Sequence, residues 1–278
     1  MPKPVRVTSR LSYIATRIFP SRRQSSGEIL KGAQATALFW RREDMLCLVT
    51  NWHNVTGWDA ANERALSDVA FTPDVIAIDL AFRKQGDHEL LARKTVYVDL
   101  YEDDSPRWRE HPTHGRKVDV VAIDVGSIDV PLFTLPVNSY DEFVDFEPVV
   151  GDDAVVIGYP LGLTGGSGFP IWKRASIATE PEIDLDGLPK VLIDTATRKG
   201  MSGSPVLAVR KGIARPRGGT GQLSGDDVLG TSETFLGVYS GRVDDDPLGA
   251  QIGIVWKAAA VAETVLYGLR GSTPHGDP

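Results

Sequence analysis

The sequence has 278 residues but only one cysteine, Cys47, so no disulfide can form within the chain. The fold must therefore be held by its hydrophobic core, and a hydrophobic content of 42% is enough for one large core or two smaller ones. Because secreted proteins commonly carry disulfides, their lack favours a reducing compartment, and we expect a cytoplasmic protein. Cys47 lies in the apolar run 45–49, which favours a buried structural thiol over a catalytic one.

The sequence also lacks long apolar runs and a basic excess. No stretch approaches the roughly 18 apolar residues of a membrane helix. The first apolar segment, 11–20, contains Arg17 and lacks the small-residue cleavage site of a signal peptide. The net charge of -7 argues against non-specific binding to DNA or RNA. We therefore expect no membrane insertion and no nucleic-acid partner.

Metal-ligand patterns are equally scarce. His111 and His114 are close in sequence, but a proline lies between them and no cysteine or carboxylate pattern accompanies them. Zinc sites usually combine several such ligands at characteristic spacings. We expect no metal site and no cofactor.

Many short segments have the composition of β-strands and are separated by Gly, Pro and Asp clusters, a pattern typical of sandwiches and barrels. These predicted strands are 33–40, 45–51, 75–82, 95–101, 118–125, 154–158, 191–195, 205–209 and 235–239. Apolar residues at four-residue spacing predict a helix near the end of the chain. The basic residues 1–25 are interpreted as a solvated extension or a docking arm for an acidic partner. Residues 211–234 have the composition of a mobile surface loop, and 272–278 of a disordered tail.

Three segments carry the residue types of a nucleophilic hydrolase. His53 follows an apolar strand, Asp119 lies among β-branched residues, and glycines flank Ser202. A serine hydroxyl needs an adjacent base, histidine titrates near neutrality, and a carboxylate fixes the imidazole tautomer. Asp124 is an alternative acid, but it would lie on the opposite strand face, so we favour Asp119. The glycines permit a tight turn that can direct the backbone N–H groups of Gly200 and Ser202 at an oxyanion.

The order His, Asp, Ser along the chain differs from that of α/β-hydrolases, in which the serine comes first. The motifs resemble those of the trypsin-like peptidases. V-T-N-W-H-N-V at 49–55 is similar to T-A-x-H-x-V, D-V-V-A-I at 119–123 to D-[IV]-A-[VL], and G-M-S-G-S-P at 200–205 to G-[DN]-S-G-[GS]-P. Segments 150–160 and 237–241 resemble the opening of the second barrel and the cleft-lining strand of the family. The likeness is to the bacterial branch that includes the high-temperature-requirement (Deg-type) proteases.

The resemblance implies an all-β fold of two six-stranded antiparallel β-barrels of the chymotrypsin type with a C-terminal α-helix. No PDZ-length segment follows the protease motifs. The implied boundaries are 26–271 for the protease domain, about 32–125 and 145–257 for the two barrels, and about 255–270 for the helix.

The resemblance also implies an activity and its residues. It implies a serine endopeptidase that acts on a protein or peptide substrate through an acyl-enzyme. The implied substrate-binding residues are Ala196, Thr197, Tyr239, Ser240 and Gly241. Because Ala196 would lie at the base of the S1 pocket and is not acidic, we expect small or medium apolar P1 residues. Met201 replaces the aspartate that activates animal zymogens, so that switch cannot operate here.

Two alternatives remain open at this point. The chain is a latent protease that an activating protease or a regulatory partner switches on, or it is a catalytically silent peptide-binding module on the same fold. The intact set of His53, Asp119 and Ser202 favours an enzyme, because binding alone does not require all three residues.

Overall fold

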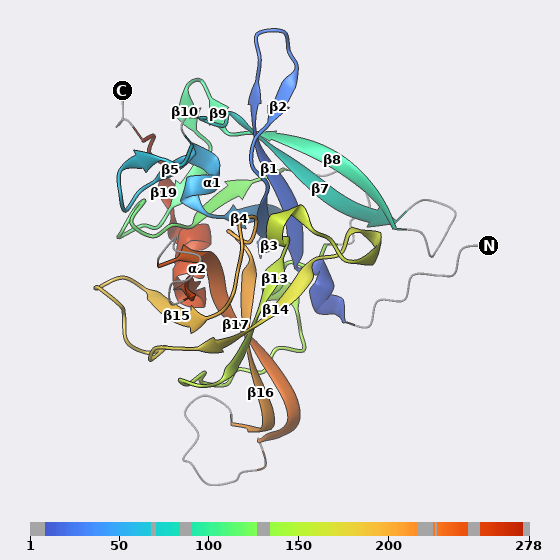
Figure 1. The fold of residues 1–278 in the computed structure, drawn as a ribbon, viewed down its shortest axis with the longest axis vertical. Helices are drawn as coiled ribbons and strands as arrows, with labels where there is room; N and C mark the ends of the chain where they lie inside the picture. The colour runs from blue at the N-terminus through green and yellow to red at the C-terminus, as the bar shows by residue number, and fades with distance from the viewer. Residues whose placement is uncertain are drawn as a thin grey trace, which may run out of the picture.

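The computed structural model describes residues 9–67, 71–83, 91–126, 134–215, 225, 227–243 and 251–274. These residues form two β-units, with helix α2 (Ala258–Tyr267) packed beside them (Figure 1). This mostly-β architecture with a C-terminal helix agrees with the fold class predicted from the sequence. Among the described residues, no helix has the length and apolarity needed to span a membrane.

The N-terminal unit is a nine-stranded antiparallel sheet with the order β19-β11-β12-β4-β3-β1-β7-β8, and β2 pairs with β1. The sequence predicted a closed six-stranded barrel here, but within the described residues the hydrogen-bonded order does not return to its first strand. Its strands are β1 (Ala15–Arg23), β2 (Ile29–Lys31), β3 (Ala35–Arg42), β4 (Met45–Thr50), β7 (Val75–Arg83), β8 (Leu91–Asp99), β11 (Trp108–Glu110), β12 (Val121–Asp124) and β19 (Leu269–Arg270). Two short ribbons accompany it, β5 (Trp58–Asp59) with β6 (Arg64–Ala65) and β9 (Tyr101–Glu102) with β10 (Ser105–Pro106).

Strand β1 differs from the solvated extension predicted over residues 1–25. It lies inside the sheet, paired with β3 on one side and β7 on the other. Ile18 of this strand is fully buried, while Arg17 forms an ion pair with Asp79 at 2.5 Å. The basic side chains of this segment therefore do not show that it is a solvated extension, because Arg17 has an acidic partner on a neighbouring strand. Residues 1–8 lie outside the described part of the chain.

The C-terminal unit is a closed six-stranded barrel with the order β13-β14-β15-β18-β17-β16. Its strands are β13 (Asp153–Gly158), β14 (Ile171–Ile177), β15 (Lys190–Asp194), β16 (Pro205–Ala214), β17 (Val228–Arg242) and β18 (Ile252–Lys257). β16 and β17 remain paired as far as Ala214 and Val228 and form a long hairpin below the barrel in Figure 1. Both ends of the predicted mobile loop 211–234 are thus strand, and 216–224 lie outside the described residues.

Three apolar clusters hold the two units. One fills the N-terminal sheet, one fills the barrel, and the third lies between them, where Leu38, Ile157 and Val261 are completely buried. Helix α2 supplies Val261 to this shared cluster, so it joins the two units. The remaining helical segments are η1 (Arg10–Tyr13), α1 (Trp52–Thr56), η2 (Val137–Ser139), η3 (Pro160–Gly162) and η4 (Gly166–Gly168).

Candidate active site

His53 lies in the short helix α1, directly after β4, and its ring meets the carboxylate of Asp119. His53 Nδ1 lies 2.7 Å from Asp119 Oδ2, and the His53 backbone N–H donates to Asp119 Oδ1 at 3.0 Å. Asn51, completely buried in front of the helix, donates from Nδ2 to the Asp119 carbonyl at 2.6 Å. Ser240 donates its hydroxyl to Asp119 Oδ2 at 2.5 Å. The carboxylate thus holds both the backbone and the imidazole of His53.

Asp119 and the alternative acid Asp124 have different surroundings. Asp119 precedes β12 instead of lying inside the strand predicted at 118–125. Asp124 forms ion pairs with Arg42 at 3.1 Å and Arg109 at 2.8 Å, and its Oδ1 accepts the Cys47 thiol at 3.2 Å. The structure therefore brings Asp119, and not Asp124, to His53.

Cys47 is buried, as the sequence predicted. Burial and the adjacent Asp124 raise the pKa of its thiol to about 12. A thiol with so high a pKa is not a nucleophile at neutral pH.

Ser202 lies in a tight turn that only glycines at its ends can form. Gly200 and Gly203 have φ values of +94° and +85°, in the left-handed region. A Cβ at Gly203 would lie 2.0 Å from the Thr36 carbonyl oxygen, and one at Gly200 would lie 2.5 Å from that of Tyr159. Thr36 of β3 donates its backbone N–H to the Ser202 carbonyl at 2.9 Å and its hydroxyl to the Gly200 carbonyl at 2.8 Å. The N-terminal sheet thus fixes the serine turn of the barrel.

The hydrogen bonds of this turn leave two backbone donors available. Within the described part of the chain, neither the N–H of Gly200 nor that of Ser202 donates to another protein group. The Ser202 hydroxyl donates to the Ser240 carbonyl at 2.8 Å, and among the described residues no hydrogen bond joins it to His53. Ser240 therefore contacts both Asp119 and Ser202.

The electrostatics of His53 are dominated by two opposing effects. Burial lowers the pKa of the imidazole, but the charge of Asp119 and its hydrogen bond to the ring outweigh that effect, and the pKa lies above its ordinary value. The side chain of His53 is 17% exposed and that of Asp119 is 16% exposed, so the pair is mostly buried but still reached by solvent. A histidine held in this way can accept a proton near neutral pH.

The residues predicted to bind substrate come from the segment that precedes the serine turn and from β17. The hydroxyls of Thr197 and Tyr239 are hydrogen-bonded to each other, and both residues are nearly completely buried. Tyr239 directly precedes Ser240 and Gly241 on β17. Ala196, expected at the base of the pocket, is exposed.

Glu110 holds the helix that carries His53 through Trp52, and the sequence alone did not identify it. It is 5% exposed, and its Oε1 accepts from the indole N–H of Trp52 at 2.9 Å and that of Trp108 at 3.2 Å. The backbone N–H of Ser272 donates to the same oxygen at 2.6 Å, so this end of the predicted tail is anchored, while 275–278 lie outside the described residues. Trp52 is the first residue of α1, so Glu110 fixes the helix that carries His53.

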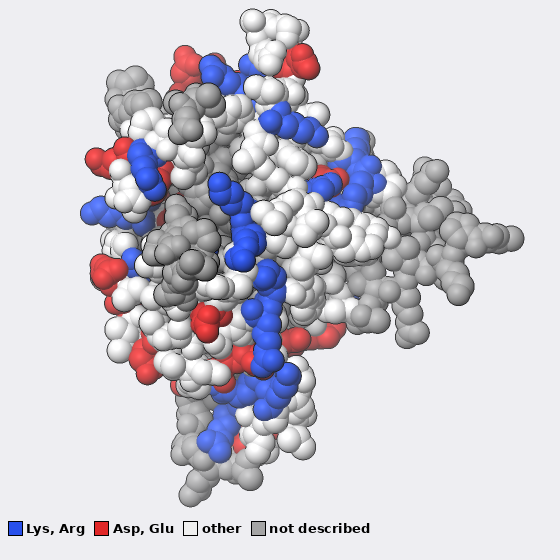
Figure 2. Space-filling view, viewed as in Figure 1, with Lys and Arg blue, Asp and Glu red and all other residues white. Residues whose placement is uncertain are grey.

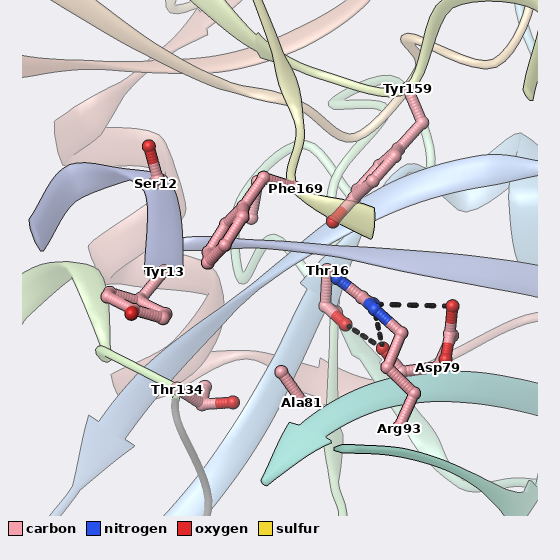
Figure 3. Close-up of a pocket in the computed structure, with 10 residues that line it drawn as sticks. Ser12, Tyr13, Thr16, Asp79, Ala81, Arg93, Thr134, Tyr159 and Phe169 are labelled. Atoms are coloured by element: carbon pink, nitrogen blue, oxygen red, sulfur yellow. Dashed lines mark hydrogen bonds and ion pairs between the residues drawn. The ribbon is translucent and has the colours of Figure 1, made fainter. Parts of the chain in front are cut away.

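A second network joins the N-terminal sheet to the loop beside the serine turn. Asp79 of β7 pairs with Arg93 of β8 at 3.3 Å, and Figure 3 shows this pair in a polar pocket opposite Tyr159. Arg93 also donates to the carbonyls of residues 167 and 168 in η4. In the same loop, the Leu161 N–H donates to the Lys199 carbonyl at 2.7 Å, next to Gly200. The network thus reaches the serine turn.

His111, one of the two histidines considered as metal ligands, is in contact with neighbouring protein groups. Its Nε2 lies 3.0 Å from Glu263 Oε2, and its Nδ1 accepts the backbone N–H groups of Thr113 and His114. Burial lowers the pKa of His111. No group of three or more His, Cys, Asp or Glu side chains in the described ranges is placed to hold a metal ion. His111 therefore has the contacts of a structural histidine.

A comparison with protein families identifies the family of this chain. The family model of a trypsin-like peptidase domain matches residues 35–213, which include His53, Asp119 and Ser202. The chain belongs to the trypsin-like peptidase family. Two crystal structures of the inactive form of the Rv3671c protease, one of them a mutant from M. tuberculosis H37Rv, are similar to this trypsin-like peptidase. They share 18% and 19% identity, with TM-scores of 0.40 and 0.41, over 91% of this chain and 85% and 87% of theirs. A comparison with curated proteins finds no match.

Proposed function

We propose that this trypsin-like peptidase is a serine endopeptidase with Ser202 as nucleophile, His53 as general base and Asp119 as the group that orients His53. The observation that carries the proposal is the contact between His53 Nδ1 and Asp119 Oδ2 at 2.7 Å. An ionised Asp119 requires the proton on Nδ1, which leaves Nε2 as the acceptor for the serine proton.

In the proposed reaction, Ser202 Oγ attacks the carbonyl carbon of the scissile bond and passes its proton to His53 Nε2. The N–H groups of Gly200 and Ser202 bind the oxyanion of the tetrahedral intermediate. His53 then gives the proton to the leaving amine, the C–N bond breaks and an acyl-enzyme remains. Water attacks the acyl-enzyme with His53 again as base, and the second peptide leaves as a carboxylic acid. No cofactor takes part in these steps.

The Ser202 hydroxyl must turn before it attacks. It donates to the Ser240 carbonyl at 2.8 Å in the structure, so the first step exchanges this bond for one to His53. This observation also favours a second candidate, a protease that stays latent until cleavage or a regulatory partner releases Ser202. A catalytically silent peptide-binding module is the remaining alternative.

The test uses a fluorophosphonate probe, which labels activated serines, and a diverse peptide library read by mass spectrometry. We expect labelling and cleavage by the wild type, and a loss of turnover of about 10⁶-fold in Ser202→Ala. Ser232→Ala is the matched control, because Ser232 is a buried serine of β17 whose hydroxyl has no partner among the described residues.

The outcomes separate the three candidates. Labelling that disappears only in Ser202→Ala supports the enzyme. Labelling that begins after limited proteolysis or addition of a partner supports latency. Peptide binding without labelling under either condition contradicts the enzymatic proposal and supports the silent module.

A further inference from the structure

The Gly200 N–H, one of the two proposed oxyanion donors, belongs to the same peptide group as the Lys199 carbonyl. A trans peptide is planar, so its C=O and N–H point in opposite directions, and fixing one fixes the other. The backbone N–H of Leu161 donates to the Lys199 carbonyl at 2.7 Å. The Leu161 hydrogen bond therefore sets the direction in which the Gly200 N–H points.

Leu161 makes this bond from a backbone conformation that a leucine rarely adopts. Its φ is +52°, in the left-handed region, and such a conformation persists only where the surrounding structure imposes it. Leu161 is 65% exposed, so the packing of its own side chain does not impose it. The conformation therefore depends on how the ends of the β13–β14 loop, residues 159–170, are held.

The N-terminal unit holds the β13–β14 loop at both ends. Near its start, Gln34, which precedes β3, donates from Nε2 to the Tyr159 carbonyl at 3.2 Å. Near its end, Arg93 of β8 donates from Nε to the Ser167 carbonyl at 3.4 Å and from Nη2 to the Gly168 carbonyl. Ser167 also has a positive φ, of +57°, so Arg93 binds a second strained position of the loop.

Arg93 is itself enclosed and oriented. Figure 2 shows Lys and Arg side chains on the surface of one face, where water solvates them, whereas the Arg93 side chain is 23% exposed. Its Nη1 lies 3.3 Å from Oδ2 of Asp79, which Arg17 also binds, and Figure 3 shows Arg93 and Asp79 together. A Cβ at Gly168 would lie 2.3 Å from Arg93 Nε. Because each guanidinium nitrogen has a protein acceptor, Arg93 cannot move without releasing the loop.

We propose that Arg93 is a positioning residue for the oxyanion donor of Gly200, and that it acts through the β13–β14 loop and the bond from Leu161 to Lys199. This inference rests on the proposed function and concerns the same site. Without Arg93, Leu161 relaxes toward negative φ, its N–H turns away from the Lys199 carbonyl, and the 199–200 peptide is free to rotate. The Gly200 N–H then no longer points at the oxyanion.

The kinetic test uses Arg93→Gln, in which Asp79 keeps Arg17 as a partner. Loss of an oxyanion donor lowers kcat by about 10²- to 10³-fold, and because Arg93 acts through the loop we expect a loss of at least about 10-fold. KM should stay within about 2-fold of the wild type. The rate of fluorophosphonate labelling should fall with kcat, because the phosphonyl oxygen uses the same donors. The pH midpoint should not move, because burial and Asp119 set the pKa of His53.

Arg42→Gln is the matched control, and it should keep the kcat of the wild type. Arg42 also pairs with a carboxylate, that of Asp124 at 3.1 Å, and donates to a backbone carbonyl, that of Val265 in α2 at 3.3 Å. Asp124 keeps Arg109 as a second partner. Arg93→Lys separates positioning from folding, because it keeps a charge beside Asp79 but not the guanidinium fork. We expect it to be nearly as stable as the wild type in urea and still to lose kcat.

The NMR signal of the 199–200 peptide gives a readout that needs no turnover. The sequence contains three Lys–Gly peptides, at 31–32, 199–200 and 211–212, so an HNCO spectrum of protein labelled with ¹³C-carbonyl lysine and ¹⁵N-glycine contains three cross-peaks. Lys31→Arg and Lys211→Arg each remove one of them, which assigns the 199–200 peak.

The spectra are compared in the Ser202→Ala background, which prevents self-cleavage. Arg93→Gln should shift the carbonyl and amide signals of 199–200 and leave the other two peaks in place. Arg42→Gln should shift none of the three.

The outcomes separate the inference from the proposed function. A lower kcat with a shifted 199–200 peak, in Arg93→Gln but not in Arg42→Gln, supports the inference. An unchanged peak, an unchanged kcat, or equal effects in the control overturns it, while cleavage by the wild type leaves the proposed function standing. If the wild type cleaves no peptide but Arg93→Gln alone shifts the 199–200 peak, positioning by Arg93 stands and the enzymatic proposal fails.

Discussion

The carbonyl oxygen of Ser240 accepts the Ser202 hydroxyl at 2.8 Å, while the side chain of the same Ser240 donates to Asp119 at 2.5 Å. One residue of β17 therefore contacts both ends of the proposed triad. Its hydroxyl donates to the carboxylate that is proposed to orient His53, and its backbone carbonyl accepts the hydroxyl of the proposed nucleophile.

Ser240→Ala tests the side-chain contact and leaves the backbone carbonyl in place. A hydrogen bond to a charged acceptor is worth about 1.5–3 kcal/mol, so we expect kcat/KM to fall by roughly 10- to 100-fold. Without this donor, Asp119 keeps more of its charge for His53, so the pKa seen in the pH profile should rise. An unchanged profile with a raised KM alone would show that Ser240 acts only on substrate.

The pH dependence of activity should follow His53. Because the pKa of His53 lies above its ordinary value, kcat/KM should rise with pH and reach half its plateau above that value. In Asp119→Asn the carboxylate no longer opposes the effect of burial, so the midpoint should move to lower pH. Activity should also fall by about 10⁴-fold, because the imidazole loses its required tautomer. A midpoint that does not move in Asp119→Asn contradicts this assignment.

Gly203→Ala should damage the serine turn. The added Cβ would lie 2.0 Å from the Thr36 carbonyl, and φ is +85°. Overpacking against backbone and a left-handed conformation together should cost about 3 kcal/mol or more, measured by urea denaturation. Gly212→Ala is the control, because Gly212 also has a positive φ, of +100°, but no atom lies within 4 Å of its added Cβ. Equal losses in both variants would assign the effect to φ and not to the contact.

Glu110→Ala should destabilise the protein and weaken catalysis. It leaves the indole N–H groups of Trp52 and Trp108 and the N–H of Ser272 without an acceptor. Each buried unsatisfied donor costs about 1–3 kcal/mol, so urea denaturation should show a loss of roughly 3 kcal/mol or more. Glu110→Gln keeps an acceptor oxygen and should recover part of the stability. A variant as stable as the wild type would contradict this role.

The sequence predicted those parts of the site that are local in the chain. Glycines around Ser202, a histidine after a strand and the order of the motifs are visible without a structure. Ser240 was predicted to bind substrate, but its contact with Asp119 was not predicted, because the two residues are 121 positions apart. Glu110 was missed for the same reason, since its donors come from three separate segments.

The fold was predicted where apolar residues are nearly continuous, as in β3, β4 and β7. β1 was missed because its arginines suggested solvent, although Arg17 has a partner in Asp79 on β7. The hairpin of β16 and β17 was missed because Gly, Ser and Arg dominate its composition, while its backbone pairing depends on a neighbouring strand. The composition of a segment indicates its own secondary-structure preference, but it does not show which distant segment pairs with it.

The pairing of β19 with β11 has a consequence for biosynthesis. Residues 269 and 270 follow the C-terminal barrel in the chain but form an edge of the N-terminal sheet. A ribosome therefore releases eight strands of that sheet long before the ninth exists, and β11 keeps an open edge while the whole barrel is being translated. Completion of the N-terminal sheet, and the hydrogen bond of Ser272 to Glu110 beside the helix that carries His53, must therefore wait until the barrel has been translated.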